Sequence, residues 1–428
     1  MKKKLKKLFD MSDGNYTPRL ILFILVLAFA VAAFTFGVTR IGHKETGLYT
    51  VEYVEEGEEA VLYRSGVTLK YYFSGSSAEI RTDMNALKSL YSSTLSRAYR
   101  TLDPENLYTG YQNLAYLSQH PGETVEISDE LYAVLKDALE KTGEGDGFNL
   151  FSGAYRKIWS EITVLYDAAE FDPAANSDSA ERLQKTFDLV NNPDNFSLEL
   201  ADDGKKTACL KLSDEYKEAR DRLELADCVL DLGLLHDAYM LRILRDALQE
   251  GGWGNGYIQT ESGLSIALSS WNKGEYLFYG FPEGEAEVFG SLPVTPQSVY
   301  SMLQVFSMNG EEEVGYYAIQ ESDAGPVLYR NPWYNPLEGP AFVSTAFGYS
   351  EDGDIVAAAY DCMKLFTAES SEVLDQRLTK SGAALSGAAV FGEEGAADAA
   401  HSGRTVYLSE GKTELFTADE KAELNIVK

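Results

Sequence analysis

One acidic residue in this 428-residue chain stands in a setting that could serve chemistry. Asp231 lies within Val229-Leu230-Asp231-Leu232-Gly233, at the end of an apolar run that predicts a strand and just before a predicted helix. A carboxylate there can cap the start of the helix, or it can hold a ligand hydroxyl or a metal-bound water. The sequence leaves both interpretations open, and Asp231 becomes the first candidate site residue.

The spacing of the residues supports neither a zinc site nor a dinucleotide-binding site. No histidine or cysteine has a partner at zinc-ligand spacing. The glycine-rich stretch Gly251–Gly256 follows a predicted helix and does not join a strand to a helix. It therefore fails the dinucleotide-binding pattern and indicates a helix stop followed by a turn.

A third arrangement has the residue order of penicillin-recognising serine enzymes. Its parts are Ser270-x-x-Lys273, Ser307-Met308-Asn309 and Lys380-Ser381-Gly382. In those enzymes the nucleophile opens a helix. Ser270 instead falls between two strand-like stretches, which argues against this chemistry.

Composition restricts the class of protein. Hydrophobic residues make up 45% and charged residues 24% of the chain, which is the balance of a folded protein with a large core. The formal net charge is −30, which argues against a nucleic-acid binder because phosphate binding needs clustered Lys and Arg. The charge is uneven: residues 1–40 carry seven basic and two acidic groups, so the rest of the chain has a net charge of −35.

The N-terminal region predicts a membrane anchor. Leu20–Val38 contains no charge and no proline, and as a helix it would rise about 28 Å, close to one hydrocarbon core. Most basic residues of the region precede it, so the positive-inside rule places residues 1–19 in the cytoplasm. We expect a connector over residues 39–60 and an extracytoplasmic domain over residues 61–428.

Two alternatives to a retained anchor remain. A cleaved signal peptide would have a shorter apolar region, about 7–15 residues, and a small-x-small cleavage site. The run here is longer and ends in Phe34-Thr35-Phe36-Gly37-Val38. A buried core helix is the other alternative, but it would leave the lysine-rich leader unexplained.

The three cysteines do not form a disulfide framework. Cys209, Cys228 and Cys362 are sparse and odd in number. A Cys209–Cys228 bridge is one interpretation, and three buried small apolar residues are the other.

Periodicity predicts a mixture of helices and strands. The predicted helices begin at Asp83, after Ser128, at Leu234 and at Ile355, and Phe196–Leu212 predicts a hairpin. Residues 382–403, rich in Ala, Gly and Ser, predict a loop. The predicted strands are Glu59–Tyr63, Val67–Phe73, Tyr257–Leu268, Glu275–Gly280, Val314–Ile319 and Ala341–Tyr349. Helices and strands do not alternate regularly, so the predicted fold class is α+β.

Six segments, taken in order, resemble motifs of the ApbE family of flavin transferases and span nearly the whole chain from about residue 60. The first four are Thr101–Asn106 with Asn113, Val125–Leu139, Gly147–Gly153 with Trp159, and Leu230–Gly233 with Tyr239. The last two are Asn335–Pro340, similar to the family's D-P-x-T-G-x-P, and the tail from Val406 to Lys421.

This resemblance implies an ApbE-like fold and an extracytoplasmic enzyme that splits FAD. Such an enzyme moves FMN, through a phosphoester, onto a Thr or Ser of a partner protein with the help of Mg²⁺. By position, the resemblance gives Asp231 and Asp361 catalytic roles, and Asp361 also a metal-binding role. It gives cofactor-binding roles to Asn113, Asn149, Gly153, Gly233, Tyr239, Gly263 and Asn335.

The chain departs from the family at the phosphate-facing positions. The family's Lys-Gly after the Asp-Leu-Gly run falls on Asp237-Ala238, so an anion replaces a cation. The paired glycines of the nucleotide loop become Ser262-Gly263. Near a phosphate, exchanging a cation for an anion is unfavourable on the kcal/mol scale.

The metal-binding motif departs as well. The family's A-D-A-x-x-T matches Ala358–Met363, which puts Ala359 at the Asp and Met363 at the Thr. Asp361 is the nearest carboxylate, but a two-residue shift faces another side of a helix.

Three further positions lack the family's functional side chain. The family's His before D-P falls on Pro332, and the acid of its F-D-P-T falls on Asn149. Ser381–Ala384 resembles the family's S-G-A-T acceptor motif, but Ala384 replaces the hydroxyl residue.

We therefore expect a membrane-anchored, ApbE-like protein that is non-catalytic or altered in its flavin or partner binding. The alternative is an active Mg²⁺-dependent FAD:protein FMN transferase, and an unrelated ectodomain is the third interpretation. FAD and Mg²⁺ are expected cofactors only if the family activity is retained. The expected partner is an extracytoplasmic protein, for example a flavoprotein.

Overall fold

The computed structural model describes residues 45–54, 66–144, 147–161, 171, 173, 176–268, 274–280, 286–304, 317–320, 327–330, 342–391 and 402–428. The predicted membrane span, the predicted strand Glu59–Tyr63 and Asn335 lie outside these ranges. Within them, no helix combines the length and the apolar character that crossing a bilayer requires.

A small compact unit comprises residues 45–48 and 72–86 of the described chain. It holds the start of β1 (Gly47–Val51), the end of β2 (Thr68–Phe73) and the first part of α3 (Ser77–Leu102). α3 begins six residues before the predicted Asp83, because Ser76 and Glu79 form a capping box: the Ser76 N–H donates to Glu79 Oε2 at 2.8 Å. The S-x-x-E spacing of Ser76 and Glu79 is the local signal of this start.

The second unit contains the rest of the chain and is built on a large antiparallel sheet. From β2 onward the strand order is β2-β6-β7-β10-β13-β14-β15-β17, and only the last pair, β15 with β17, is parallel. The strands after β2 are β6 (Gly256–Gln259), β7 (Leu264–Ala267), β10 (Val299–Gln304), β13 (Val343–Ser350), β14 (Leu385–Phe391), β15 (Ser402–Ser409) and β17 (Glu423–Val427).

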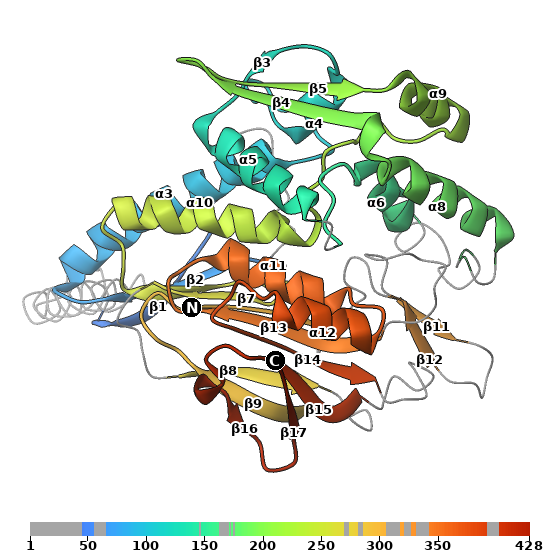
Figure 1. The fold of residues 1–428 in the computed structure, drawn as a ribbon. Helices are drawn as coiled ribbons and strands as arrows, with labels where there is room; N and C mark the ends of the chain where they lie inside the picture. The colour runs from blue at the N-terminus through green and yellow to red at the C-terminus, as the bar shows by residue number, and fades with distance from the viewer. Residues whose placement is uncertain are drawn as a thin grey trace, which may run out of the picture. The chain divides into compact units, whose positions relative to one another are not determined.

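Two helices, α11 (Ile355–Phe366) and α12 (Ser371–Thr379), cover one face of this sheet (Figure 1). Eleven of the twelve residues of α11 are buried, as expected for a helix that is apolar on all sides. Its side chains Leu365 and Phe366 share a core cluster with Leu374 of α12 and Val343 of β13. α11 also contacts α10 (His236–Glu250), so it lies between the sheet and a further helix.

A small sheet, β16-β9-β8, packs on the opposite face (Figure 1). Aromatic rings fill the space between: the centroids of Phe278 and Phe347 are 4.8 Å apart. The elements of this layer are β8 (Glu275–Gly280), β9 (Glu287–Pro293), η4 (Thr413–Leu415) and β16 (Thr417–Ala418). A separate hairpin pairs β11 (Tyr317–Gln320) with β12 (Val327–Arg330).

The segment between α3 and α10 forms a second group of helices with its own sheet, β3-β5-β4. Its strands are β3 (Val125–Glu126), β4 (Phe196–Asp202) and β5 (Lys206–Leu212). Its helices are α4 (Leu114–Gln119), α5 (Asp129–Gly143), α6 (Gly153–Ser160), α8 (Ser177–Val190), η2 (Pro193–Asn195), α9 (Asp214–Leu223) and η3 (Gly233–Leu235).

The structure confirms the α+β class and most predicted elements. The helix Ile355–Phe366 and the strand Glu275–Gly280 have the predicted bounds, and the hairpin forms as β4 and β5. Tyr257–Leu268 was wrong as one strand, because a turn at Thr260–Gly263 divides it into β6 and β7. The predicted loop at 382–403 was wrong in part: its small residues form β14, where α11 and a neighbouring strand lie close on either side.

We predict that Gly348→Ala destabilises the fold. An added Cβ at Gly348 would lie 2.1 Å from the backbone oxygen of Ala358 in α11, so the helix must move off the sheet. The expected loss is about 1–3 kcal/mol in the free energy of unfolding, measured by urea denaturation. Gly143→Ala is the matched control, because nothing lies within 4 Å of the added atom. Equal stability of the two variants would contradict this account of β13 and α11.

Candidate functional site

Two motif segments that are far apart in sequence lie side by side. The Gly153 N–H donates to the Val229 oxygen at 3.0 Å, and the Asp231 N–H donates to the Leu150 oxygen at 2.9 Å. A Cβ on Gly153 would lie 2.7 Å from Cys228 Sγ, which explains why this position needs a glycine. The apolar run before Asp231 is therefore not a strand, as predicted, but an extended loop bound to the 150–153 loop.

Asp231 is held by two internal contacts. Its Oδ1 accepts the Gly233 N–H at 2.7 Å, and its Oδ2 accepts Arg156 Nε at 3.0 Å. Gly233 has φ +58°, so the carboxylate stabilises a left-handed backbone position that favours glycine. The contact with Gly233 closes the turn that leads into η3. Asp231 does not cap α10 as predicted, because the N-cap residue of α10 is Leu235, which makes no side-chain cap bond. Arg156, 75 positions away, gave no signal in the sequence.

The two asparagines assigned to cofactor binding use their amides within the fold. Asn113 is fully buried; its Oδ1 accepts the Tyr116 N–H and caps α4, and its Nδ2 donates to the Asn106 oxygen at 2.7 Å. Asn149 donates to the Val190 oxygen at 2.8 Å and accepts the Phe151 N–H at 2.9 Å. The contacts of Asn113 fix the start of α4, and those of Asn149 fix the loop before α6.

Two departures from the family pattern meet in space. Asp237, in the first turn of α10, accepts a hydrogen bond from Ser262 Oγ at 2.6 Å. Ser262 lies in the β6–β7 turn and receives a further bond from Thr260 Oγ1 at 2.8 Å. The carboxylate at the position of the family's Lys and the hydroxyl at the position of its glycine therefore form one unit.

His236 joins this unit through its ring. Its Nδ1 lies 3.1 Å from Asp237 Oδ1. Burial opposes protonation of the imidazole, but the hydrogen bond and charge of Asp237, with the charges of Asp231 and Asp103, outweigh it and raise the pKa of His236. The ring edge also contacts Tyr99. We call His236, Asp237, Thr260 and Ser262 the α10 polar cluster.

Tyr239 and Gly263, two residues assigned to cofactor binding, are enclosed by other parts of the chain. Tyr239 is fully buried, and the guanidinium of Arg242 lies 4.9 Å from its ring centroid. Burial, followed by the charge of Asp137, raises the pKa of its hydroxyl far above the usual range. Gly263 has φ +89°, and a Cβ there would lie 2.0 Å from the Met302 oxygen.

Asp361 is the most enclosed carboxylate of the candidate set. Its Oδ1 accepts Lys364 Nζ at 2.7 Å, and both side chains are about nineteen-twentieths buried. Its Oδ2 accepts three bonds from the turn before β14: Ser381 Oγ at 2.9 Å, Gly382 N at 2.8 Å and Ala383 N at 2.6 Å. Lys364 is not among the predicted site residues, although the i, i+3 spacing of two opposite charges on an apolar helix is a sequence signal for this pair.

These surroundings do not fit the cofactors that the resemblance implies. Both oxygens of Asp361 are engaged, and the described residues contain no group of three His, Cys, Asp or Glu side chains placed to hold a metal. The α10 polar cluster contains the carboxylate of Asp237, and a carboxylate repels the negative charge of a pyrophosphate. Asn335 and Pro332 lie outside the described residues, so their assignments stay predictions.

The cysteines are all free and buried, as the simpler interpretation predicts. Burial is the main reason that the pKa of the Cys228 thiol lies well above its usual value. A buried, protonated thiol is a poor nucleophile, so the surroundings of Cys228 do not indicate a catalytic cysteine.

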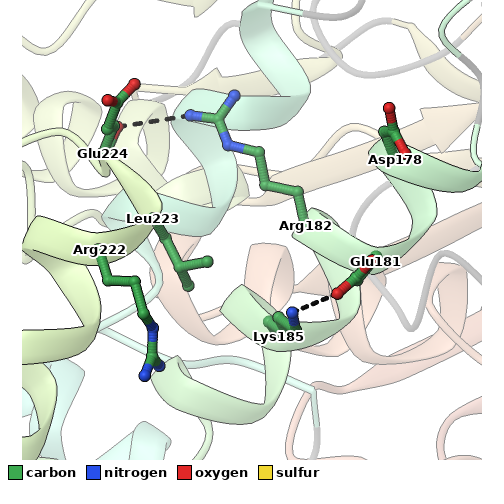
Figure 2. A pocket seen from close by; sticks show the side chains of 7 residues that line it. All are labelled: Asp178, Glu181, Arg182, Lys185, Arg222, Leu223 and Glu224. Atoms are coloured by element: carbon green, nitrogen blue, oxygen red, sulfur yellow. Dashed lines mark hydrogen bonds and ion pairs between the residues drawn. The ribbon is translucent and has the colours of Figure 1, made fainter.

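A shallow hollow of about 430 Å³ lies on the surface at α8 and the end of α9 (Figure 2). Lys185 pairs with Glu181 within it, and Arg182 donates to the Glu224 oxygen at 3.4 Å. Its lining is Asp178, Glu181, Arg182, Lys185, Arg222, Leu223 and Glu224. Acidic and basic groups balance, so the hollow shows no preference for a charged ligand.

The sheet order, the helix α11 on one face and the small sheet on the other define a mixed α+β fold that is ApbE-like. The flavinyl transferase ApbE of Pseudomonas stutzeri, in its apo form, is similar with a TM-score of 0.52 and 13% identity over 88% of this chain and 98% of that one. A mutant of the flavin transferase ApbE from Vibrio cholerae is similar with a TM-score of 0.52 and 12% identity, over 87% and 100%.

Comparison of the amino-acid sequence finds fewer relatives than comparison of the fold. No protein-family model matches the chain, and no curated protein sequence matches it. At 12–13% identity the likeness to the two transferases shows the fold alone.

We predict that Asp237 and Ser262 are energetically coupled. Asp237→Asn, Ser262→Ala and the double variant form a cycle in which the coupling energy should be about 0.5–3 kcal/mol. Either single variant already breaks the partly buried, charged hydrogen bond, so the second substitution has no further bond to break. Urea unfolding of the four proteins measures it. The same cycle on the exposed i, i+4 pair Glu181 and Lys185 is the control and should give a coupling at or below the lower end of this range. Additive effects at Asp237 and Ser262 would contradict the contact.

We also predict a pH dependence that originates at His236. Because its pKa is raised in the folded state, its protonation stabilises the fold fully below the unfolded pKa of about 6.5 and less as the pH rises through the folded-state pKa. The stability difference between the wild type and His236→Gln should therefore shrink from about pH 5.5 to 8.5. In an Asp237→Asn background burial is opposed only by the charges of Asp231 and Asp103, so this shrinkage should be lost or reversed. A difference that grew with pH when Asp237 is present would exclude this assignment.

Proposed function

We propose that this chain is a non-catalytic ApbE-like protein that uses the fold to hold a partner protein and does not transfer FMN. We place it at the outer face of a membrane, anchored by residues 20–38. The anchor is supported by the uncharged length of that segment and the basic leader before it. The expected partner is an extracytoplasmic protein, and the net charge of −35 beyond residue 40 favours one with basic surface groups.

The contact between Asp237 and Ser262 carries the proposal. The N-terminus of a helix attracts negative charge, and ligand phosphates commonly use it. In α10 that place is taken by the chain's own carboxylate, which is only 15% exposed. At an effective dielectric constant of 20, a phosphate charge about 4 Å from Asp237 would meet a repulsion of about 4 kcal/mol.

A second observation supports the loss of transfer chemistry. An acceptor hydroxyl needs a base that is free to take its proton. Asp231 and Asp361 are the two carboxylates assigned that role, and each already accepts internal hydrogen bonds on both of its oxygens. A base held in this way would have to give up contacts that stabilise the fold.

We predict that calorimetry with FAD gives no binding heat for the full-length protein, with or without Mg²⁺. The ApbE transferase of Vibrio cholerae in the same buffer is the positive control. In a parallel incubation with FAD and an acceptor protein of that enzyme, in-gel flavin fluorescence should label the acceptor only in the control. Flavinylation by the wild-type chain would establish the active-transferase alternative.

A pair of variants tests the stated cause. Asp237→Lys with Ser262→Gly removes the anion and its donor, and it should bind FAD more tightly than the wild type. Asp237→Asn removes the charge alone and should lie between the two. If all three proteins fail to bind FAD, the anion at α10 is not the barrier.

A further inference from the structure

The large sheet ends at an edge strand whose side chains are exposed. β17 is the last strand in the sheet order, and its partner is β15. Residues 423–426 are exposed, and the large apolar side chains of Leu424 and Ile426 are each 44% exposed. The free side of an edge strand carries backbone N–H and C=O groups that no neighbouring strand pairs with, so it is a template for a further strand.

Two rows of side chains cross the sheet and end at β17. Each row takes one residue from β13, β14, β15 and β17, on the face that packs against the small sheet. The rows consist of Phe347, Gly387, Leu408 and Ile426, and of Thr345, Ala389, Val406 and Leu424. All members before β17 are buried, and the last member of each row is exposed. The core on this face therefore reaches the edge of the sheet and is left uncovered there.

These rows define the side chains that a further strand would need. Side chains of paired strands lie beside each other on one face, so two apolar residues two positions apart would continue both rows. The residue between them would lie beside Asn425 on the opposite face, where Val427 packs against the core cluster of α11 and α12. By contrast β8, an edge strand of the small sheet, exposes one large apolar side chain, Leu277.

The charges at β17 favour a basic segment of another protein over a second copy of this chain. Glu420 and Glu423 are exposed, and no ion pair joins either of them to another described residue. The nearby cations Lys421 and Arg404 instead contact Glu287, at 2.8 and 3.1 Å. A lysine or arginine on a further strand can reach Glu423 across the pair. A second copy would bring another region with a net charge of −35, and like charges repel.

We propose that β17 binds an extended segment of the partner protein, which adds to the large sheet as its next strand. The segment carries two apolar residues two positions apart, beside Leu424 and Ile426, and a basic residue beside Glu423. This rests on the proposed function for the existence of a partner, and it names the surface that binds it. Backbone hydrogen bonds hold such a strand, and its side chains give the selectivity.

Fluorescence anisotropy of labelled synthetic peptides with the full-length protein tests the proposal. The probe Thr-Lys-Val-Thr-Val-Lys-Thr has both valines on one face and a lysine next to each, so it fits the pattern in either strand direction. It should bind saturably below about 1 mM, and less tightly as salt is added. The scramble Lys-Val-Val-Lys-Thr-Thr-Thr has the same charge, but its valines lie on opposite faces, and it should not saturate. A probe that does not bind, or a scramble that binds equally well, would overturn the proposal.

N-methylated probes separate strand pairing from charge attraction. Successive N–H groups of a strand point to opposite edges, so methylation of both valines and methylation of the central threonine block different edges. One of these two probes should lose binding and the other should keep it. If their affinities are equal, the peptide is not bound as a strand and the proposal is wrong.

Variants locate the binding strand. Leu424→Thr with Ile426→Thr keeps residue types that favour strands but removes most of the apolar surface, and it should weaken binding of the probe about tenfold. Glu423→Gln should weaken it less and reduce its salt dependence. Leu277→Thr on β8 is the matched control and should leave the affinity unchanged. An unaffected double variant, or an equal loss in the control, would contradict the assignment to β17.

Two further measurements separate this proposal from its alternatives. In sedimentation, a dimer that Leu424→Thr with Ile426→Thr converts to a monomer would assign β17 to a second copy and overturn the proposal. Calorimetry with FAD is independent of β17. Binding of FAD would therefore contradict the proposed function and leave the peptide result standing, whereas a probe that does not bind would leave the FAD result standing.

Discussion

Burial of α11 between the large sheet and α10 is the constraint on which the rest of the larger unit depends. The helix contacts β7, β10, β13 and β14 on one side and α10 with η3 on the other. Gly348 lets its backbone approach β13 closely, and its apolar residues fill the core cluster shared with α12. Such packing leaves the two charged side chains of α11 almost fully buried, so they must neutralise each other.

The candidate site is arranged around this helix and the start of α10. η3 and α11 are in contact, and His236 and Asp237 of the α10 polar cluster follow directly after η3. Asp231 holds the turn that leads into η3, and Asp237 closes the helix start against the β6–β7 turn. Side chains that resemble the motif residues of a flavin transferase here stabilise turns and helix ends. Caps and tight turns constrain these residue types by themselves, so the motif positions have a structural role whatever chemistry the fold carries.

Strong local signals were enough for much of the fold. The apolar periodicity of Ile355–Phe366 and the turn residues of the β4–β5 hairpin led directly to the correct elements. Local signals failed where distant partners decide the structure. The run before Asp231 pairs with a loop and not with a strand, and the Ala- and Ser-rich segment after Ser381 becomes β14 because its small side chains suit a position beside α11 and β13.

The sequence by itself determined the acidic character of the chain, its α+β class and the order of its motifs, because composition and periodicity are local properties. It also determined which positions depart from the family pattern. Only the tertiary structure decided that two of those departures, Asp237 and Ser262, meet across 25 residues, and that Asp361 is neutralised by Lys364 and the turn at Ser381. The physical reason is that the state of a carboxylate depends on which donors and charges surround it in space, and the chain brings those together only when it folds.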